Sequence, residues 1–379
     1  MTAAVPKTPL RSARSSPVLS AAGVRSLLRW YTRHRRDLPW RRTRNPFAIW
    51  ISEILLQQTQ VETVRPYFLR FLAAFPTVED LAAAPLEDVL KAWEGCGYYA
   101  RARHLHLAAA EIVRRGGFPE SAAEWQQLPG IGRYTAAAIA SITRDEPVPV
   151  VDGNVERVLA RVLCERRLIR SAAVVRRLWT VAGGIMGTAV AQKFKPGVLN
   201  QALMEVGATV CMPKRAMCEI CPLASECRGR SALEDVTILP RKAPKKKIPH
   251  YDIGAAIIEK GGKILITQRP LDGMLGGLWE FPGGKQDAGE TLEECVAREI
   301  TEELGIEIEV GERFAKVNHA YSHFRITLHV YRCKPRKGRI RKIGIADYRW
   351  VTPDQLDDFA FPKADRVVIV KLKAENPKR

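Results

Sequence analysis

The spacing of apolar residues changes near residue 250, and this change constrains the fold more than any other feature of the sequence. Before it, apolar residues recur at intervals of three and four, the period of an amphipathic helix. Five segments show this pattern: Ile51–Leu72, Leu86–Trp93, Ala102–Val113, Thr135–Ile142 and Val155–Leu163. Proline and glycine residues separate these segments. The sequence therefore predicts a compact all-α region from Val24 to about Ile220.

After Tyr251 the sequence is typical of β-strands. Short runs rich in Ile and Val replace the helical period: Ile253–Glu259, Lys263–Gln268, Ile306–Val310, Ile326–Arg332 and Tyr348–Val351. One helical segment, Thr291–Leu304, lies among them. This part of the chain is therefore predicted to be an α/β domain with a mixed sheet.

The length of 379 residues is enough for two or three domains. No apolar run approaches the roughly 18 residues that a membrane helix needs, so a membrane-spanning protein is excluded. We expect four regions in chain order: a disordered basic tail (1–23), a helical region (24–232), a basic Pro-rich linker (233–249) and an α/β domain (250–375).

The formal net charge of +19 is concentrated in the first two thirds of the chain. Residues 1–240 carry 33 Lys and Arg against 21 Asp and Glu, whereas residues 249–379 carry 22 against 20. A basic region of this kind is typical of polyanion-binding proteins. Charge alone leaves DNA, RNA and anionic membrane surfaces open as partners.

Four of the eight cysteines lie within 17 residues, at Cys211, Cys218, Cys221 and Cys227. A disulfide framework would spread its cysteines through a small secreted domain, so this local cluster indicates a metal centre in a reducing compartment. Four thiolates at this spacing suit a cuboidal iron–sulfur cluster. A structural zinc ion with four Cys ligands is the alternative.

The segment Leu128–Thr135 contains a Pro-Gly-x-Gly turn between two helical segments. Gly130 and Gly132 allow a tight turn whose backbone N–H groups face outward at a helix N-terminus, where a phosphate can bind. The same pattern also occurs in ordinary turns, so the motif alone does not establish a DNA contact.

Two acidic residues stand out in the helical region. Glu53 interrupts an apolar helical run, and burial there would raise its pKa into the range of a general acid. Asp152 stands at the start of a helix, where a carboxylate is held ionised by the helix N-terminus. The alternatives are an exposed glutamate on an amphipathic helix and a plain N-cap aspartate.

These motifs resemble a known group of enzymes. The cysteine spacing resembles the 4Fe-4S loop of the endonuclease III superfamily of DNA glycosylases, and the glycine turn resembles its helix-hairpin-helix motif. Four further segments are similar to the adenine DNA glycosylases of the MutY family: Leu38–Arg41, Ser52–Gln60, Gly97–Arg101 and Val151–Arg157. The resemblance covers about residues 24–375.

The resemblance implies roles for particular residues. Glu53 would be the general acid and Asp152 would stabilise the sugar cation, with Tyr134 and Asn154 supporting the site. The implied DNA contacts are Arg41, Gln58, Thr59, Tyr98, Gly130 and Gly132, and of these Gln58 and Tyr98 would enter the duplex. Relatives that also cut the strand carry a Schiff-base lysine at the position of Tyr134. Tyrosine there implies a monofunctional glycosylase, with a bifunctional glycosylase/lyase of the endonuclease III type as the alternative.

The C-terminal third resembles Nudix hydrolases. Gly284, Glu290, Arg298 and Gly305 stand at the spacing of the Nudix signature, together with Glu299, Glu302 and Glu303. These last three glutamates share one helix face, and a Mg²⁺ ion there is a further expectation. His319–Phe324 is similar to the Phe-Ser-His loop with which the family reads 8-oxoguanine, with Tyr321 in place of Phe. Ser322 and His323 are therefore predicted to contact that base.

Together these observations predict a monofunctional enzyme that removes adenine opposite 8-oxoguanine or guanine in double-stranded DNA and leaves an abasic site. We expect a 4Fe-4S cofactor, a monomer and a cytoplasmic, DNA-associated location. An active Nudix pyrophosphohydrolase in the C-terminal domain is one alternative, and a DNA-binding module without catalysis is another. Glu53 and Asp152 argue against the latter, because binding alone requires neither.

Overall fold

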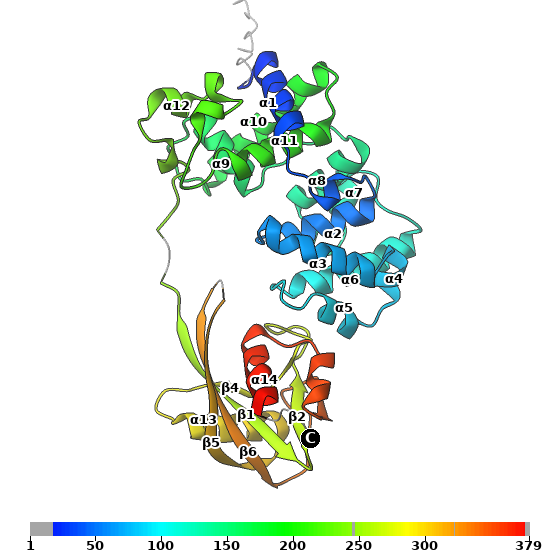
Figure 1. The fold of residues 1–379 in the computed structure, drawn as a ribbon, viewed down its shortest axis with the longest axis vertical. Coiled ribbons are helices and arrows are strands. Elements are labelled where there is room, and N and C mark those ends of the chain that lie inside the picture. Colours follow the sequence, from blue (N-terminus) through cyan, green and yellow to red (C-terminus); the bar gives the residue numbers. More distant parts are fainter. Residues whose placement is uncertain (1–17, 245–246, 322, 376–379) are drawn as a thin grey trace, which may run out of the picture. The chain divides into compact units, whose positions relative to one another are not determined.

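The computed structural model describes residues 18–244, 247–321 and 323–375 (Figure 1). The chain divides into two compact units. The first comprises Met1–Ile49, Pro119–Gln127 and Ile131–Ala243, and the second comprises Trp50–Phe118, Leu128–Gly130 and Pro244–Arg379. The predicted helical region therefore contributes to both units, whereas the predicted α/β domain lies wholly in the second.

The predicted tail lies mostly outside the described residues, which begin at residue 18. Helix α1 (Ala21–His34) starts within it, and the side chain of Ser20 caps this helix by accepting a hydrogen bond from the backbone N–H of Gly23. Leu19 is fully buried. Helix α1 thus begins before Val24, within the predicted tail.

The first unit is built from helices around one apolar core. Besides α1 and the start of α2 (Pro46–Leu56), its helices are α7 (Ala122–Trp125), α8 (Arg133–Arg144), α9 (Gly153–Val162), α10 (Ala172–Ala191), α11 (Pro196–Thr209) and α12 (Arg228–Ala232). Short 3-10 turns lie at Pro39–Arg41, Cys218–Ile220, Ala224–Glu226 and Val236–Ile238. Helix α11 packs closely on α8, where a Cβ atom at Gly197 would lie 2.4 Å from the carbonyl oxygen of Ser141.

The helical part of the second unit contains the end of α2 and four further helices. These are α3 (Val61–Ala74), α4 (Val78–Ala83), α5 (Leu86–Ala92) and α6 (Ala100–Arg115). The continuous helical segment predicted over Ile51–Leu72 is wrong, because α2 ends at Leu56 and α3 begins at Val61. Gln58 lies between them in the left-handed region, with φ +61°, which a continuous helix does not allow. The other four helical segments are confirmed.

The C-terminal domain contains a mixed seven-stranded sheet, as predicted. Its strands are β1 (His250–Lys260), β2 (Lys263–Gln268), β3 (Trp279–Glu280), β4 (Gly283–Lys285), β5 (Glu307–Ala320), β6 (Arg325–Lys337) and β7 (Asp347–Val351). The main order is β3-β2-β1-β6-β5, β4 pairs with β1, and β7 pairs with β2. Only β1 and β6 run parallel, in a pairing that extends from His250↔Arg325 to Ile258↔Cys333.

Two helices cover the opposite faces of this sheet (Figure 1). Helix α13 (Leu292–Leu304), predicted from the sequence, buries Val296, Ile300 and Leu304 against one face. Helix α14 (Lys363–Glu375) buries Val368, Ile369 and Leu372 against the other. The sequence analysis missed α14, because its run of valine and isoleucine favours a strand by intrinsic preference.

A 3-10 turn and several backbone contacts occupy the first half of the predicted linker. Ile169 donates a backbone hydrogen bond of 2.9 Å to Arg241, and Leu239 is buried within the first unit.

In the described part of the chain, no helix is both long and apolar enough to cross a membrane.

Candidate active site and cysteine loop

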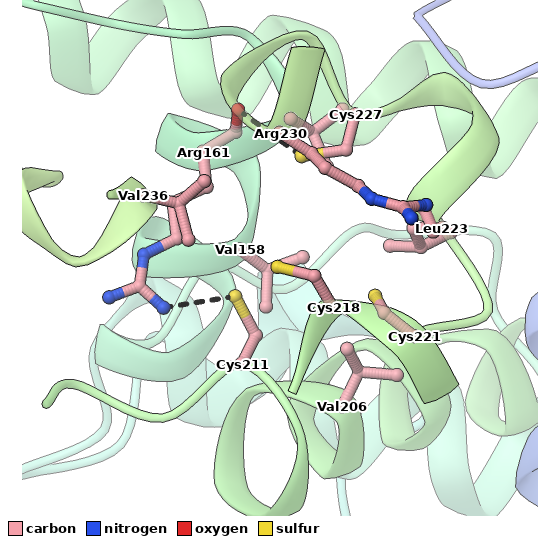
Figure 2. A pocket seen from close by; sticks show the side chains of 12 residues that line it. Val158, Arg161, Val206, Cys211, Cys218, Cys221, Leu223, Cys227, Arg230 and Val236 are labelled. Carbon is pink, nitrogen blue, oxygen red and sulfur yellow. Dashed lines mark hydrogen bonds between the residues drawn. The ribbon is translucent and has the colours of Figure 1, made fainter. Parts of the chain in front are cut away.

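The four clustered cysteines surround one pocket in the first unit (Figure 2). Cys211 follows α11, Cys218 and Cys221 flank a 3-10 turn, and Cys227 precedes α12. Figure 2 shows their sulfur atoms bordering a common space lined by apolar side chains. The apolar residues are Val158, Val162, Val206, Leu223 and Val236. The fold thus brings together the four cysteines that the sequence predicted to share one centre.

Arg161 holds this loop from helix α9. Its side chain is almost completely buried, and its Nε donates to the carbonyl of Leu239 at 2.9 Å. One terminal nitrogen donates to Cys211 Sγ at 3.3 Å and to the Met212 carbonyl at 2.9 Å, and the other donates to Pro213 at 3.1 Å. The sequence analysis missed this residue, although an arginine among the apolar positions of α9 was a signal.

Burial disfavours the charged form of these thiols. It raises the pKa of Cys221 to about 12, and burial together with the neighbouring cysteines raises the pKa values of Cys218 and Cys227. Positive charge is therefore needed before all of the thiols ionise together. Among the described residues, no three His, Cys, Asp or Glu side chains are placed to hold a single metal ion.

Asp152 caps helix α9 and is fixed by three hydrogen bonds. Its Oδ1 accepts from the backbone N–H groups of Asn154 at 3.0 Å and Val155 at 2.7 Å, and its Oδ2 accepts from Asn154 Nδ2 at 2.9 Å. Burial raises the pKa of Asp152, while these three donors act in the opposite direction. The N-cap alternative is therefore correct as geometry, and it orients a half-buried carboxylate at a helix N-terminus.

Asn154 links this carboxylate to the cysteine loop through Arg157. One terminal nitrogen of Arg157 donates to Asn154 Oδ1 and to the carbonyl of Gly207, each at 2.7 Å. Its Nε donates to the carbonyl of Cys211, also at 2.7 Å. Tyr134, on α8 of the same unit, donates its hydroxyl to Met204 Sδ at 3.4 Å. Asn154 thus orients Asp152 directly.

Glu53 lies in α2 within the second unit and is only 4% exposed. Ser52 beside it is fully buried, and the apolar residues Ile51, Ile54 and Leu55 surround it in sequence. The alternative of a solvent-exposed glutamate on an amphipathic helix is therefore wrong. The helix therefore carries a buried carboxyl group within an apolar segment.

Gln58 and Tyr98, the two residues expected to enter the duplex, are both exposed and both have left-handed backbone. Gln58 has φ +61° and Tyr98 has φ +48°. Thr59 is half-buried beside Gln58, and its hydroxyl lies 3.5 Å from the carbonyl of Gln57. Cys96, just before Tyr98, has a thiol whose pKa burial raises to about 12.

The glycine turn has the backbone that its sequence predicted. Gly130 has φ +74°, and a Cβ atom there would lie 2.6 Å from the Cβ of His104. Gly132 is the N-cap residue of α8, and it has no side chain to cover that helix end. Gly130 thus serves a tight turn with a close neighbour, and Gly132 leaves the N-terminus of α8 open.

Arg41, a predicted DNA contact, is placed differently. Its guanidinium donates to Glu205 at 2.7 Å and to the carbonyl of Arg36 at 3.1 Å, and its side chain is 11% exposed. Glu205 is fully buried, and although burial acts in the opposite direction, hydrogen bonds from Arg36 and Arg41 lower its pKa to about 2. Arg41 thus neutralises a buried carboxylate, and we do not include it in the DNA interface.

The three Nudix-type glutamates do not have equivalent surroundings. Arg298 pairs with Glu299 at 3.0 Å and with Glu302 at 3.1 Å, and also with Glu290 at 2.7 Å. Glu303 has a buried Oε2, and burial together with Glu280 and Glu299 raises its pKa to about 8. Arg298 thus pairs with Glu299 and Glu302 on this acidic face, whereas the surroundings of Glu303 favour its protonated form.

The predicted base-reading loop joins β5 to β6. Tyr321 stacks on Phe324, with ring centroids 4.7 Å apart, and meets His319 edge-on at 4.6 Å. His323 is exposed, and Ser322 lies outside the described residues. Within the second unit, four residues of this segment line a pocket: His319, Tyr321, His323 and Phe324. The pocket is also lined by Tyr67, Tyr98, Tyr99, Phe361 and Arg366. Sequence analysis identified the loop but not its neighbours from α3 and α6.

Comparisons with known proteins match both parts of the chain. A model of the HhH-GPD superfamily base excision DNA repair protein matches residues 51–182, and a NUDIX domain model matches residues 254–371. The human adenine DNA glycosylase is 34% identical, over 93% of this chain and 74% of the human protein. The adenine DNA glycosylase of Buchnera aphidicola subsp. Acyrthosiphon pisum is also 34% identical, over 79% of this chain and 82% of its own.

Among solved structures, a thermostable thymine-DNA glycosylase is similar, with 28% identity and a TM-score of 0.49, over 55% of this chain and 95% of its own. The predicted fold class, an all-α helix-hairpin-helix region followed by an α/β Nudix-like domain, is confirmed. The curated relatives extend over both parts of the chain. This chain therefore belongs to the adenine DNA glycosylase family.

Proposed function

We propose that the enzyme removes adenine paired with 8-oxoguanine or guanine in double-stranded DNA and leaves an abasic site in an uncut strand. The observation that carries this proposal is Glu53, a carboxyl group buried in an apolar helix at the position of the family's general acid. A binding module would gain little from it, because burying an ionisable group costs free energy.

In the proposed reaction, protonated Glu53 donates its proton to the adenine ring and converts the base into a neutral leaving group. The N-glycosidic bond then breaks toward an oxocarbenium-like sugar, as in glycoside hydrolysis. Asp152, held in its ionised form by Asn154 and Val155, stabilises this cation. Water completes the hydrolysis at the sugar carbon.

The uncut strand follows from Tyr134. A glycosylase that also cuts DNA needs an amine at this position to form a Schiff base with the sugar, and a phenol does not form one. The bifunctional alternative is therefore disfavoured by a single side chain.

We propose that Cys211, Cys218, Cys221 and Cys227 bind a 4Fe-4S cluster. The donor set fits this group, because four thiols border one pocket with an otherwise mainly apolar lining. When bound, the cluster supplies the positive charge that lets the thiols ionise and cross-links the loop. Lys214, Arg215, Arg228 and Arg230 would then face DNA phosphates from an anchored position.

The C-terminal domain is proposed to recognise the base opposite adenine. Hydrogen-bond donors in the loop between β5 and β6, including His323 and Ser322, would distinguish 8-oxoguanine from guanine. The aromatic side chains around His323 support this role, because they offer stacking surfaces beside the exposed imidazole.

A Nudix pyrophosphohydrolase is the second candidate function of this domain. The observation in its favour is Glu303, whose pKa is raised by burial and by the charges of Glu280 and Glu299, because a bound Mg²⁺ ion would favour its ionised form. The Arg298 pairs with Glu299 and Glu302 act against it, because a Mg²⁺ ion would have to compete with Arg298 for these two glutamates. Mg²⁺-dependent hydrolysis of 8-oxo-dGTP, lost on Glu302→Gln, would establish this activity.

The proposed function is tested by duplex nicking. A labelled duplex with one A:8-oxoguanine pair is incubated with the enzyme, and half of each sample is heated in alkali. We expect strand breaks only after alkali, on A:8-oxoguanine and A:G but not on A:T duplexes. Breaks without alkali, with efficient borohydride trapping of the enzyme on DNA, would instead identify a glycosylase/lyase.

A further inference from the structure

The loops that carry Gln58 and Tyr98 share a backbone feature that needs outside support. Both residues have a Cβ atom and positive φ values of +61° and +48°. The left-handed region is unfavourable for such residues, so each loop keeps this shape only where other contacts hold it. A contact that holds both loops would set both side chains at once.

The guanidinium of Arg101, on helix α6, makes such a contact. One terminal nitrogen donates to the carbonyls of Ile54 and Gln57, each at 2.7 Å. The other donates to the carbonyls of Cys96 at 3.0 Å and Gly97 at 3.2 Å. One planar group therefore joins the segment just before Gln58 to the segment just before Tyr98.

The same guanidinium also lies against aromatic rings. Its central carbon is 5.6 Å from the ring centroid of Tyr98 and 5.3 Å from that of Trp93. Trp93 in turn donates its Nε1 proton to the carbonyl of Gly97 at 3.0 Å. Arg101 thus contacts both the backbone of the Tyr98 loop and the side chain that this loop presents.

The acceptors explain why an arginine stands here. Ile54 lies in the last turn of α2, where carbonyl groups have no partner within the helix and carry partial negative charge. A guanidinium reaches several carbonyls in fixed directions, whereas a lysine ammonium is a compact charge on a flexible stem. The geometry therefore uses the fork of the arginine and not only its charge.

We propose that Arg101 is a positioning residue that sets Gln58 and Tyr98 together for insertion into the duplex. This inference rests on the proposed function and on the resemblance, which implies that these two side chains enter the duplex. Because unstacking costs a few kcal/mol, insertion at the correct place lowers the barrier to base extrusion.

A double-mutant cycle tests the inference, because it separates action through Gln58 and Tyr98 from a general loss of structure. Arg101→Gln is measured in the full chain and in a Gln58→Ala/Tyr98→Ala background. Two readouts are used on an A:8-oxoguanine duplex: the excision rate at sub-saturating enzyme, and the fluorescence of 2-aminopurine placed at the adenine position. We expect Arg101→Gln to lower both readouts at least tenfold in the otherwise wild-type chain. In the Gln58→Ala/Tyr98→Ala background it should lower them less than twofold.

Equal losses in the two backgrounds would overturn the inference, because Arg101 would then act independently of both side chains. The matched control is Arg114→Gln on the same helix, an exposed arginine paired with Glu111 at 2.7 Å, which should change neither readout. Thermal unfolding confirms that each variant is folded at the assay temperature.

If Arg101→Gln does not fold, Arg101→Lys replaces it in the cycle, since lysine keeps the charge but loses the fork. A lysine variant with the wild-type excision rate and fluorescence would also overturn the inference. Failure of the proposed function is distinct from either result, because the wild-type chain itself would then release no adenine.

Discussion

The first unit and the C-terminal domain both bury carboxyl groups, but they surround them differently. In the first unit Glu205 accepts from Arg36 and Arg41, and Glu165 accepts from Arg167 and Arg177. Hydrogen bonds from Arg167 and Arg177 lower the pKa of Glu165 to about 2, and those from Arg36 and Arg41 do the same for Glu205 against the effect of burial. Buried carboxylates in this unit are thus kept ionised by paired arginines.

In the C-terminal domain, buried carboxyl groups outnumber the cations among them. Arg269 pairs with Glu280 at 2.6 Å, and the charges of both residues also act on Glu303 and Asp365. Burial and the charge of Glu280 raise the pKa of Glu303 to about 8 and that of Asp365 to about 7. The difference shows that a buried acidic side chain is ionised only where the fold also supplies hydrogen-bond donors or cations to it.

The largest effect on the excision rate is expected from Glu53→Gln, compared with the same substitution of a glutamate in the C-terminal domain. Glu53→Gln should lower the single-turnover excision rate at least about 10²-fold, because the general acid is lost, while duplex affinity stays nearly unchanged. Glu303→Gln is the matched control in the C-terminal domain and should change excision less than twofold. Near-normal turnover of the Glu53 variant would contradict the assignment of the acid.

A smaller effect is expected from His323→Ala in the base-reading loop. Loss of one donor to the oxidised base should reduce discrimination between 8-oxoguanine and guanine by about 1–3 kcal/mol. The measurement is the ratio of excision rates on A:8-oxoguanine and A:G duplexes, with Lys316→Ala on β5 as a control outside the loop. An unchanged ratio would remove His323 from base readout.

The cysteine loop provides a test of affinity rather than chemistry. Purified protein should be brown and contain iron, and Cys218→Ser should lower the iron content and weaken duplex binding several-fold, because the basic residues of the loop lose their anchor. Cys164→Ser, outside the cluster, should bind iron and DNA normally. Stoichiometric zinc without iron after anaerobic preparation would show that the pocket holds a different centre.

The smallest effect concerns the pH dependence of stability. The folded pKa of Asp365 is about 7 and its ordinary value is 3.8, so its contribution to stability is present below about pH 4 and is lost as the pH rises through 7. Asp365→Asn still accepts the hydrogen bond from the Phe281 N–H and removes this dependence. Its melting temperature should exceed that of the wild type by a few degrees at pH 8 and not at pH 4. Equal differences at both pH values would show that Asp365 is not protonated in the fold.

Local patterns in the sequence were sufficient to predict much of this protein. Strand runs such as Lys263–Gln268, the helix before Gly305 and the cysteine spacing depend on neighbours in the chain. The family motifs are local in the same sense, so they located Glu53 and Asp152 before any fold was known. Helix α14 was missed for a local reason as well, because its β-branched residues favour a strand.

The tertiary structure alone decided which partner each charged group meets. Arg41, Arg101 and Arg161 are the same residue type within helical sequence. Arg41 neutralises Glu205, Arg101 joins the loops of Gln58 and Tyr98, and Arg161 fixes the cysteine loop. Three of their acceptors, Gln57, Cys211 and Glu205, lie between 44 and 164 positions away in the chain. Spacing along the sequence predicts which face of a helix a residue occupies, but the carbonyl or carboxylate opposite it is set by the packing of distant segments.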